Sequence, residues 1–180
     1  MNEIISTQEE TISKPKDAII IEAKQIEENC LFTAKGHYVC AQFWSKFHLW
    51  IGIPTVILAA VTGTLIFVKL DKVNITAGVL SILIIVLSAI TTFLNPKETA
   101  SSHLNAGNNY DSLMTKARMF WSIQCKIESS DLVLTEKLRE LAEFRDRLNR
   151  ESPQIPYLAY KKAKKGIEKG ETGRTIMKKT

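Results

Sequence analysis

The sequence predicts an all-α membrane protein, in which a two-transmembrane helical hairpin joins an N-terminal cytosolic helix to a C-terminal cytosolic helical bundle. Residues 47–96 are a run of 50 residues with only three fixed charges, and all three lie within residues 69–72. Apolar residues on both sides of this run recur at spacings of three and four, as they do on one face of a helix. No segment shows the period of two that indicates a strand.

The arm that precedes this run divides into two parts. We expect residues 1–18 to be disordered or weakly ordered. Residues 19–46 carry a stripe of apolar and small side chains, which predicts a cytosolic helix that continues directly into the membrane. The stripe consists of Ile19, Ala23, Ile26, Cys30, Thr33, His37, Cys40, Trp44 and Phe47.

Two uncharged runs predict the membrane-spanning helices. Residues 47–68 read FHLWIGIPTVILAAVTGTLIFV, and residues 73–96 read VNITAGVLSILIIVLSAITTFLNP. Each is longer than the roughly 20 residues that cross about 30 Å of hydrocarbon as a helix. Residues 69–72, KLDK, are too few to form a domain and predict a tight turn. The alternative is a hairpin buried in a soluble bundle, but soluble core helices rarely extend past about 18 residues without a charge.

The second arm, residues 97–167, is predicted to form two or three cytosolic helices. Pro96 should end the second span, and Ser129–Asp131 indicate a break followed by a helix cap. A stripe with alternating spacings of three and four, like a heptad seam, precedes this break. It consists of His103, Ala106, Tyr110, Leu113, Ala117, Phe120, Gln124 and Ile127.

The seams of these helices need partners, which are either each other or another copy of the chain. We expect self-association, and the candidate residues for an oligomer seam are Tyr110, Leu113, Ala117 and Phe120. The helix after the break places another stripe on one face. It consists of Leu134, Leu138, Leu141, Arg145 and Leu148.

The C-terminal part of the chain ends in a basic segment. Ser152–Pro156 should end the preceding helix, and a last short helix is expected from about Tyr157 to Ile167, followed by a flexible tail over residues 168–180. Residues 161–180 contain eight basic and two acidic residues, so all of the net charge of +5 lies here. Such a segment is either simply solvated or attracted to anionic lipid headgroups.

The sequence contains no familiar catalytic motif. There is no GxxxxGK[ST], GxSxG or CxxC, and the spans contain no carboxylate, so we expect neither an enzyme nor a cofactor. His37 with Cys40, and His48 and His103 elsewhere, come nearest to a metal site, but zinc needs four converging ligands and we expect no metal. Three arginines form a weak candidate for an anion-binding site. Acidic residues alternate with them in the sequence, which is also the pattern of an ordinary charged helix face. The three arginines are Arg145, Arg147 and Arg150.

The cysteines indicate on which side of the membrane the two arms lie. Cys30, Cys40 and Cys125 are odd in number and suit reduced thiols better than a disulfide framework. We therefore expect both termini to lie in the cytosol.

Polar residues within the spans are the candidates for a pore lining. On the second span they recur on one helical face, together with Asn74, and on the first they accompany small residues. They either pack helices closely with hydroxyl groups as bridges, or they line a water-filled path. The candidates are Ser81, Ser88, Thr92, Asn95, Thr55 and Thr62.

Three segments together resemble the SLATT family, the two-transmembrane effectors that are associated with nucleotidyltransferase and SLOG genes in bacterial conflict systems. They are HYVCAQFWSKFHLWIGIPTVILAAVTGT, FLNPKETASSHLNAGNNYDSLMTKARMF and SPQIPYLAYKKAKKGI, in this order. The resemblance covers about residues 22–167, so that residues 19–167 are expected to form one SLATT-like domain.

The resemblance implies a membrane effector of antiviral, CBASS-like defence, located in the bacterial inner membrane. Such an effector would oligomerise and permeabilise the membrane in response to a nucleotide signal or a partner. The implied partners are the lipid bilayer, other copies of the chain, and a cyclic nucleotide or a nucleotidyltransferase-linked protein, with no nucleic acid. The alternative is a membrane-anchored adaptor whose cytosolic helices recruit proteins and whose hairpin only tethers them.

Overall fold

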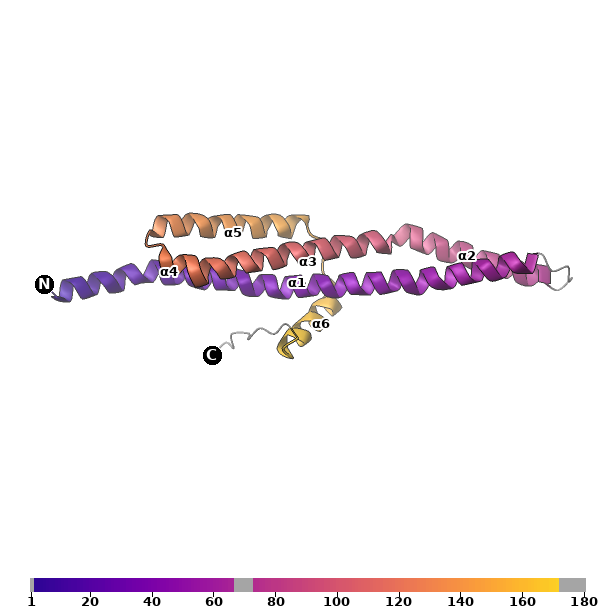
Figure 1. The fold of residues 1–180 in the computed structure, drawn as a ribbon, viewed down its shortest axis with the longest axis horizontal. Helices are drawn as coiled ribbons and strands as arrows, with labels where there is room; N and C mark the ends of the chain where they lie inside the picture. The colour runs from indigo at the N-terminus through magenta and orange to yellow at the C-terminus, as the bar shows by residue number, and fades with distance from the viewer. Residues whose placement is uncertain (1, 67–72, 172–180) are drawn as a thin grey trace. The chain divides into compact units, whose positions relative to one another are not determined.

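The computed structural model describes the backbone of residues 2–66 and 73–171 and the side chains of residues 15–65 and 75–171 (Figure 1). All elements in this described part are helices, which confirms the all-α prediction. In chain order they are α1 (Asn2–Ile66), α2 (Val73–Leu94), α3 (Pro96–Met119), the π-helical turn η1 (Phe120–Gln124), α4 (Cys125–Ile127), α5 (Asp131–Glu151) and α6 (Tyr157–Glu168).

The chain divides into two compact units. Unit 1 consists of residues 1–39 and 103–180, and unit 2 consists of residues 40–102. The first part of α1 therefore belongs to the same bundle as α5 and α6. This refines the prediction, which treated the N-terminal helix and the C-terminal bundle as separate parts.

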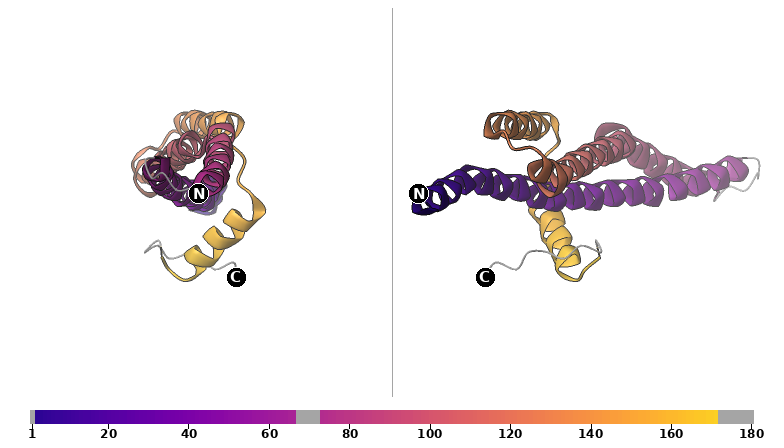
Figure 2. Two further views of the ribbon diagram at one scale, coloured as in Figure 1. Left: turned by 90° about the vertical axis from the view of Figure 1, so that its right-hand side faces the viewer. Right: turned by 60° about the vertical axis from the view of Figure 1, so that its left-hand side comes forward.

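The core of unit 1 is built by α1, α3 and α5, with the turn η1 and α4. Side chains at spacings of three and four on each helix interlock, as ridges do in helix packing. One cluster of buried residues contains Ile26, Cys30, Ala34, Tyr110, Leu113, Met114, Ala117 and Leu148. A second cluster contains Ile19, Ala23, Phe120, Cys125 and Leu134. In both Figure 1 and Figure 2, α5 and α6 lie on different sides of α1.

The π-helical turn changes which residues face this core. Phe120 and Cys125 are both buried, although five residues separate them. In a regular α-helix two such residues point about 140° apart, whereas a π turn brings them to the same face. The seam predicted from the sequence is therefore wrong at its end, because Ile127 is exposed and Cys125 takes the core position.

A half-buried carboxylate holds this turn against α1. Glu27 accepts hydrogen bonds from Arg118 Nε at 2.7 Å and from Trp121 Nε1 at 2.6 Å. The Glu27 side chain is largely shielded from water, so its two charge-assisted bonds are stronger than exposed ones. Lys24 lies 4.8 Å from the centre of the Trp121 ring and adds a cation–π contact. The polar contacts thus fix the register of α1 against α3 and η1.

Most predicted helix boundaries agree with the structure. The helix of residues 19–46 and the first span form one continuous helix, α1, and the last helix begins at Tyr157 as expected. The backbone is already helical from Asn2, where little order was expected. The predicted turn at residues 69–72 and the tail from residue 172 onward lie outside the described residues.

Asn95 separates α2 from α3. Its φ angle is +40°, the left-handed region that asparagine tolerates better than most residues. Pro96 then begins α3, where its missing N–H is not needed for helical hydrogen bonding. Helix α2 therefore ends at Leu94, two residues before the predicted end of the second span, and Pro96 is the first residue of α3.

The burial of Leu113 predicts the stability of unit 1. Its side chain is fully buried, so the change Leu113→Ala should lower the free energy of unfolding by about 2–5 kcal/mol through lost contacts and a cavity. The matched control is Leu132→Ala, because Leu132 is 85% exposed on α5 and should change stability by less than about 0.5 kcal/mol. Chemical denaturation in detergent measures both, and equal losses would contradict this core assignment.

Candidate functional site

The outer surface of the hairpin in unit 2 is almost entirely apolar. Trp50 on α1 is 79% exposed and Phe93 on α2 is 90% exposed, and large aliphatic side chains surround them. In the most apolar window of each of the two candidate spans only 6% of the residues are buried. A soluble core helix would be mostly buried, and an apolar patch of this extent is unstable in water. The hairpin therefore has the surface of a protein segment surrounded by lipid.

The two spans share a regular seam. In unit 2, α2 lies alongside the last part of α1 (Figures 1 and 2). The half-buried and buried residues on each helix recur at spacings of three and four, which is the pattern of coiled-coil packing. The seam residues include Ile51, Thr55, Leu58, Thr62 and Leu65 on α1, and Ala77, Ser81, Ile84, Leu87 and Thr91 on α2.

The candidate pore-lining residues do not share one face of the hairpin. Thr55 and Ser81 are half-buried and Thr62 is buried, so these three lie on the seam. By contrast, Ser88, Thr92 and Asn95 are exposed. Asn95 is explained by the left-handed junction between α2 and α3, and its Nδ2 donates a hydrogen bond to Glu98. Only Ser88 and Thr92 therefore remain as outward-facing lining candidates.

Several hydroxyl groups of the spans find partners within their own helices. Thr55 donates to the Ile51 carbonyl at 2.7 Å, Ser81 to Ala77 at 2.8 Å and Thr92 to Ser88 at 2.9 Å. Such bonds satisfy the donors without water, so the hydroxyls do not need a pore. Thr62 Oγ1 is buried with no hydrogen-bond partner among the described residues. The polar stripe alone thus does not decide between packing and lining.

The four residues assigned to an oligomer seam pack inside the core of a single copy of the chain. Tyr110, Leu113 and Ala117 belong to the first core cluster of unit 1, and Phe120 belongs to the second. The Tyr110 hydroxyl also donates to Asn149 Oδ1 at 2.7 Å. This corrects the assignment, because side chains that pack against α1 and α5 are not available to a second copy.

A pair of buried histidines joins α1 to α3. The Nδ1 atoms of His37 and His103 are 3.0 Å apart, so one ring donates its N–H to the other. The Tyr110 ring stacks on His37 with centroids 5.5 Å apart. Burial and then the charge of His103 lower the pKa of His37 to about 4, and burial lowers the pKa of His103. The sequence stripes placed both histidines on helical faces, but nothing in the sequence showed that they meet.

The described residues contain no cluster of three or more possible metal ligands. Cys40 lies in unit 2, whereas the histidine pair belongs to unit 1. Within unit 1 the two rings contact each other through the hydrogen bond between their Nδ1 atoms.

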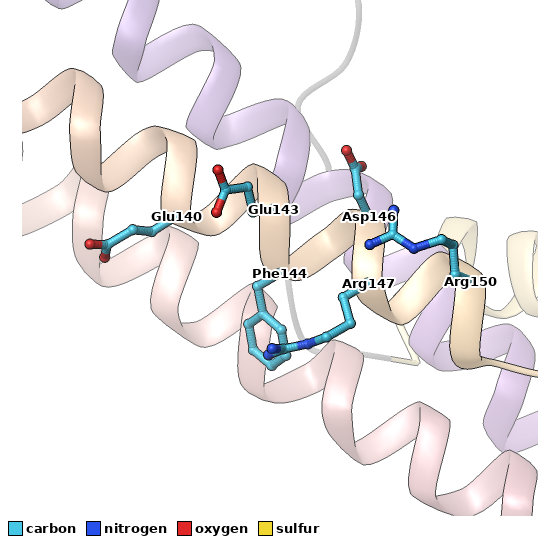
Figure 3. A pocket seen from close by; sticks show the side chains of 6 residues that line it. All are labelled: Glu140, Glu143, Phe144, Asp146, Arg147 and Arg150. Carbon is cyan, nitrogen blue, oxygen red and sulfur yellow. The ribbon is translucent and has the colours of Figure 1, made fainter.

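The three candidate anion-binding arginines face two different pockets. Arg147 and Arg150 line an open pocket of about 540 Å³ on α5, together with Glu140, Glu143 and Asp146 (Figure 3). The Arg147 guanidinium lies 4.9 Å from the centre of the Phe144 ring. Three carboxylates against two arginines disfavour an anion there. Arg145 instead lines a separate pocket of about 380 Å³ among α1, α3, α5 and α6.

Comparison with known families gives one match over most of the chain. Residues 22–176 match the model of SMODS and SLOG-associating 2TM effector domain family 4. No curated protein and no solved structure matches the chain.

The histidine pair predicts a pH dependence of stability. Because the pKa of His37 falls from 6.5 to about 4 on folding, the folded state binds fewer protons than the unfolded state between these values. The contribution of His37 to the free energy of unfolding is fully present above pH 6.5 and is lost as the pH falls toward 4. The free energy of unfolding should fall by about 1 kcal/mol per pH unit in this window from this group.

The change His37→Asn removes the titrating ring while an amide can still bond to His103. Thermal unfolding in detergent should show a smaller loss of stability between pH 6.5 and 5 for this variant than for the unchanged chain. An unaltered pH slope would show that other groups cause the effect.

Proposed function

The chain belongs to SMODS and SLOG-associating 2TM effector domain family 4, and from this membership we propose that it oligomerises and permeabilises the bacterial inner membrane in response to a nucleotide signal or a partner. The members of this family are two-transmembrane effectors of conflict systems. The two apolar helices of this chain, whose side chains are largely exposed, fit a membrane protein of this kind. We expect it to act without catalysing a reaction.

Permeabilisation requires several copies of this hairpin. Two helices that pack along a seam leave no space between them for a column of water, because the seam side chains fill it. A water-filled path must therefore be enclosed by helices from different copies. Oligomerisation is thus a physical requirement of the proposal rather than an addition to it.

An exposed face of small and hydroxyl-bearing residues on α2 carries the proposal. Gly78, Ser88 and Thr92 are exposed, and no atom lies within 4 Å of the position that a Cβ would take on Gly78. Small residues on a lipid-facing helix allow the backbones of neighbouring helices to approach closely. Ser88 and Thr92 oxygens can also accept hydrogen bonds from water. This face is suited to meet other copies around a shared axis.

The composition of unit 1 supports a topology with both arms on one side of the membrane. Buried residues from both arms, such as Ile26 and Leu113, pack into one core, although the hairpin separates them in the chain. Two spans return the chain to the side from which it started, which permits this packing. We place both arms in the cytosol because Cys30 and Cys125 are free thiols.

The topology is tested with reporter fusions before α1 and after α6. Reporters that are active only in the cytosol should be active at both positions, and reporters that are active only in the periplasm should be inactive at both. A different result at the two ends would contradict the hairpin, and periplasmic activity at both would reverse its orientation.

The pore proposal predicts the effect of making the exposed α2 face apolar. In vesicles loaded with a small dye, a high ratio of protein to lipid favours assembly by mass action and replaces the unknown trigger. The double change Ser88→Leu with Thr92→Leu should lower the leak rate about tenfold or more, which is a barrier increase of about 1.4 kcal/mol. The reason is that a path lined by leucine excludes water.

The matched control changes Val79→Leu and Val86→Leu, which lie on a different exposed face of α2 and should leave the leak unchanged. Oligomer size, measured by crosslinking in the same vesicles, should be similar for all variants. Full leak with both polar sites apolar would remove this face from the mechanism. An absence of leak from the unchanged chain at every ratio would favour the membrane-anchored adaptor.

A further inference from the structure

We infer that the pocket around Arg145 in unit 1 is a binding site for a nucleotide, an inference that rests on the proposed response to a nucleotide signal. We call it the Arg145 pocket; its polar and aromatic lining includes Asn29, Phe32, Thr33, Arg145, Asn149 and Tyr160. Its volume of about 380 Å³ lies within the usual range for small-molecule sites, about 300–1,000 Å³.

Charge distinguishes the Arg145 pocket from the two others described on unit 1. The pocket that Arg147 and Arg150 line contains three carboxylates, and the third pocket contains Lys116 and Lys137 together with Glu140. The lining of the Arg145 pocket contains one guanidinium and no carboxylate. Among these three pockets, it is therefore the one in which no carboxylate of the lining repels an anionic ligand.

Arg145 retains donors that a phosphate group can use. Its Nε and Nη2 atoms are each 3.1 Å from Asp146 Oδ1, which occupies two of the five guanidinium N–H groups. The Asp146 side chain is about half exposed, so this ion pair is weak and competes little with a ligand. The remaining N–H groups match the oxygens of a phosphate.

The Cys30 thiol does not add a negative charge beside Arg145. Cys30 lines the same pocket, and burial raises the pKa of its thiol to about 12 despite the opposing effect of Arg145. The thiol is therefore neutral at pH 7 and does not neutralise the guanidinium.

The rest of the lining suits a nucleobase rather than a bare phosphate. Phe32 on α1 and Tyr160 on α6 provide aromatic faces on which a base can stack. The Tyr110 hydroxyl donates to Asn149 Oδ1, which leaves the Asn149 amide N–H groups as donors. Asn29 adds a second amide, and amides form paired hydrogen bonds with base edges. One cation, two aromatic faces and two amides together match a nucleotide.

A ligand in this pocket would connect three helices of unit 1. Tyr160 belongs to α6, in which Ala163, Gly166 and Ile167 are buried. Asn29 and Phe32 belong to α1, the helix that continues into the first span. Binding would therefore fix α6 to the helix that enters the membrane, which provides a route from signal to hairpin.

Binding is measured with the full chain in detergent by isothermal titration calorimetry. The probes are AMP, GMP and cyclic di-AMP, with adenosine and inorganic phosphate as the two halves of a nucleotide. At least one nucleotide should bind, and each half should bind about tenfold more weakly or worse. The change Arg145→Gln should weaken nucleotide binding about tenfold or more through the lost phosphate contact. The change Tyr160→Ala should do the same through lost base stacking.

Two matched controls lie on the same helices. Arg147→Gln removes the same charge from α5 outside the pocket, and Tyr157→Ala removes an exposed ring from α6. Both should bind as the unchanged chain does. Thermal unfolding checks that each variant is folded, and Tyr160→Ala supplies the test if Arg145→Gln does not fold.

Three results would overturn the site. They are no binding of any probe nucleotide up to about 1 mM, an equal loss in Arg147→Gln and Arg145→Gln, or phosphate binding as tightly as the nucleotides. Dye leak is measured separately from nucleotide binding, so the results distinguish a failure of the nucleotide site from a failure of the proposed permeabilisation. Leak without nucleotide binding would remove this site and keep the proposed function, whereas binding without leak would keep the site and remove the function.

Discussion

The structure depends on the absence of water around the hairpin. Hydrocarbon offers no hydrogen bonds to a polypeptide backbone, so the chain must cross it as helices that satisfy their own N–H and C=O groups. The hydroxyls of Thr55 and Ser81 follow the same constraint, since both donate to carbonyls of their own helix. An even number of crossings then returns the chain to its starting side. This return allows α1 to share one core with α3 and α5.

The two units are stabilised by different interactions because unit 1 is surrounded by water and unit 2 by lipid. Unit 1 buries leucine, isoleucine and methionine from water and fixes its register with polar contacts such as Glu27 to Arg118 and Trp121. Lipid removes the hydrophobic drive from the spans, so unit 2 relies on close packing of small and aliphatic residues. Under the proposed function, a signal that binds unit 1 would act on the part of the chain that lies in water. Helix α1 is continuous from that part into the first span.

The sequence predicted the helices well because each carries its own periodic signal. The charge-free runs and Pro96 defined both spans, and the stripe from Leu134 to Leu148 defined α5. It could not show which seams meet, so Tyr110 and Leu113 were assigned to an oligomer although they pack against α1. The π turn after Met119 has no signal in the spacing of residues, which explains the error at Ile127. The contact of His37 with His103 and the separation of Arg145 from Arg147 depend on tertiary packing alone.

The central claim is that the exposed face of α2 meets water when copies assemble, and thiol labelling tests it most directly. The three native cysteines are buried, so a cysteine placed by Ser88→Cys reports on its own surroundings. A membrane-impermeant maleimide needs a thiolate in water. The account predicts that Ser88→Cys is labelled in vesicles at a high ratio of protein to lipid and protected at a low ratio, while Val86→Cys is protected at both. Protection of Ser88→Cys at both ratios, or equal labelling of the two positions, would contradict it.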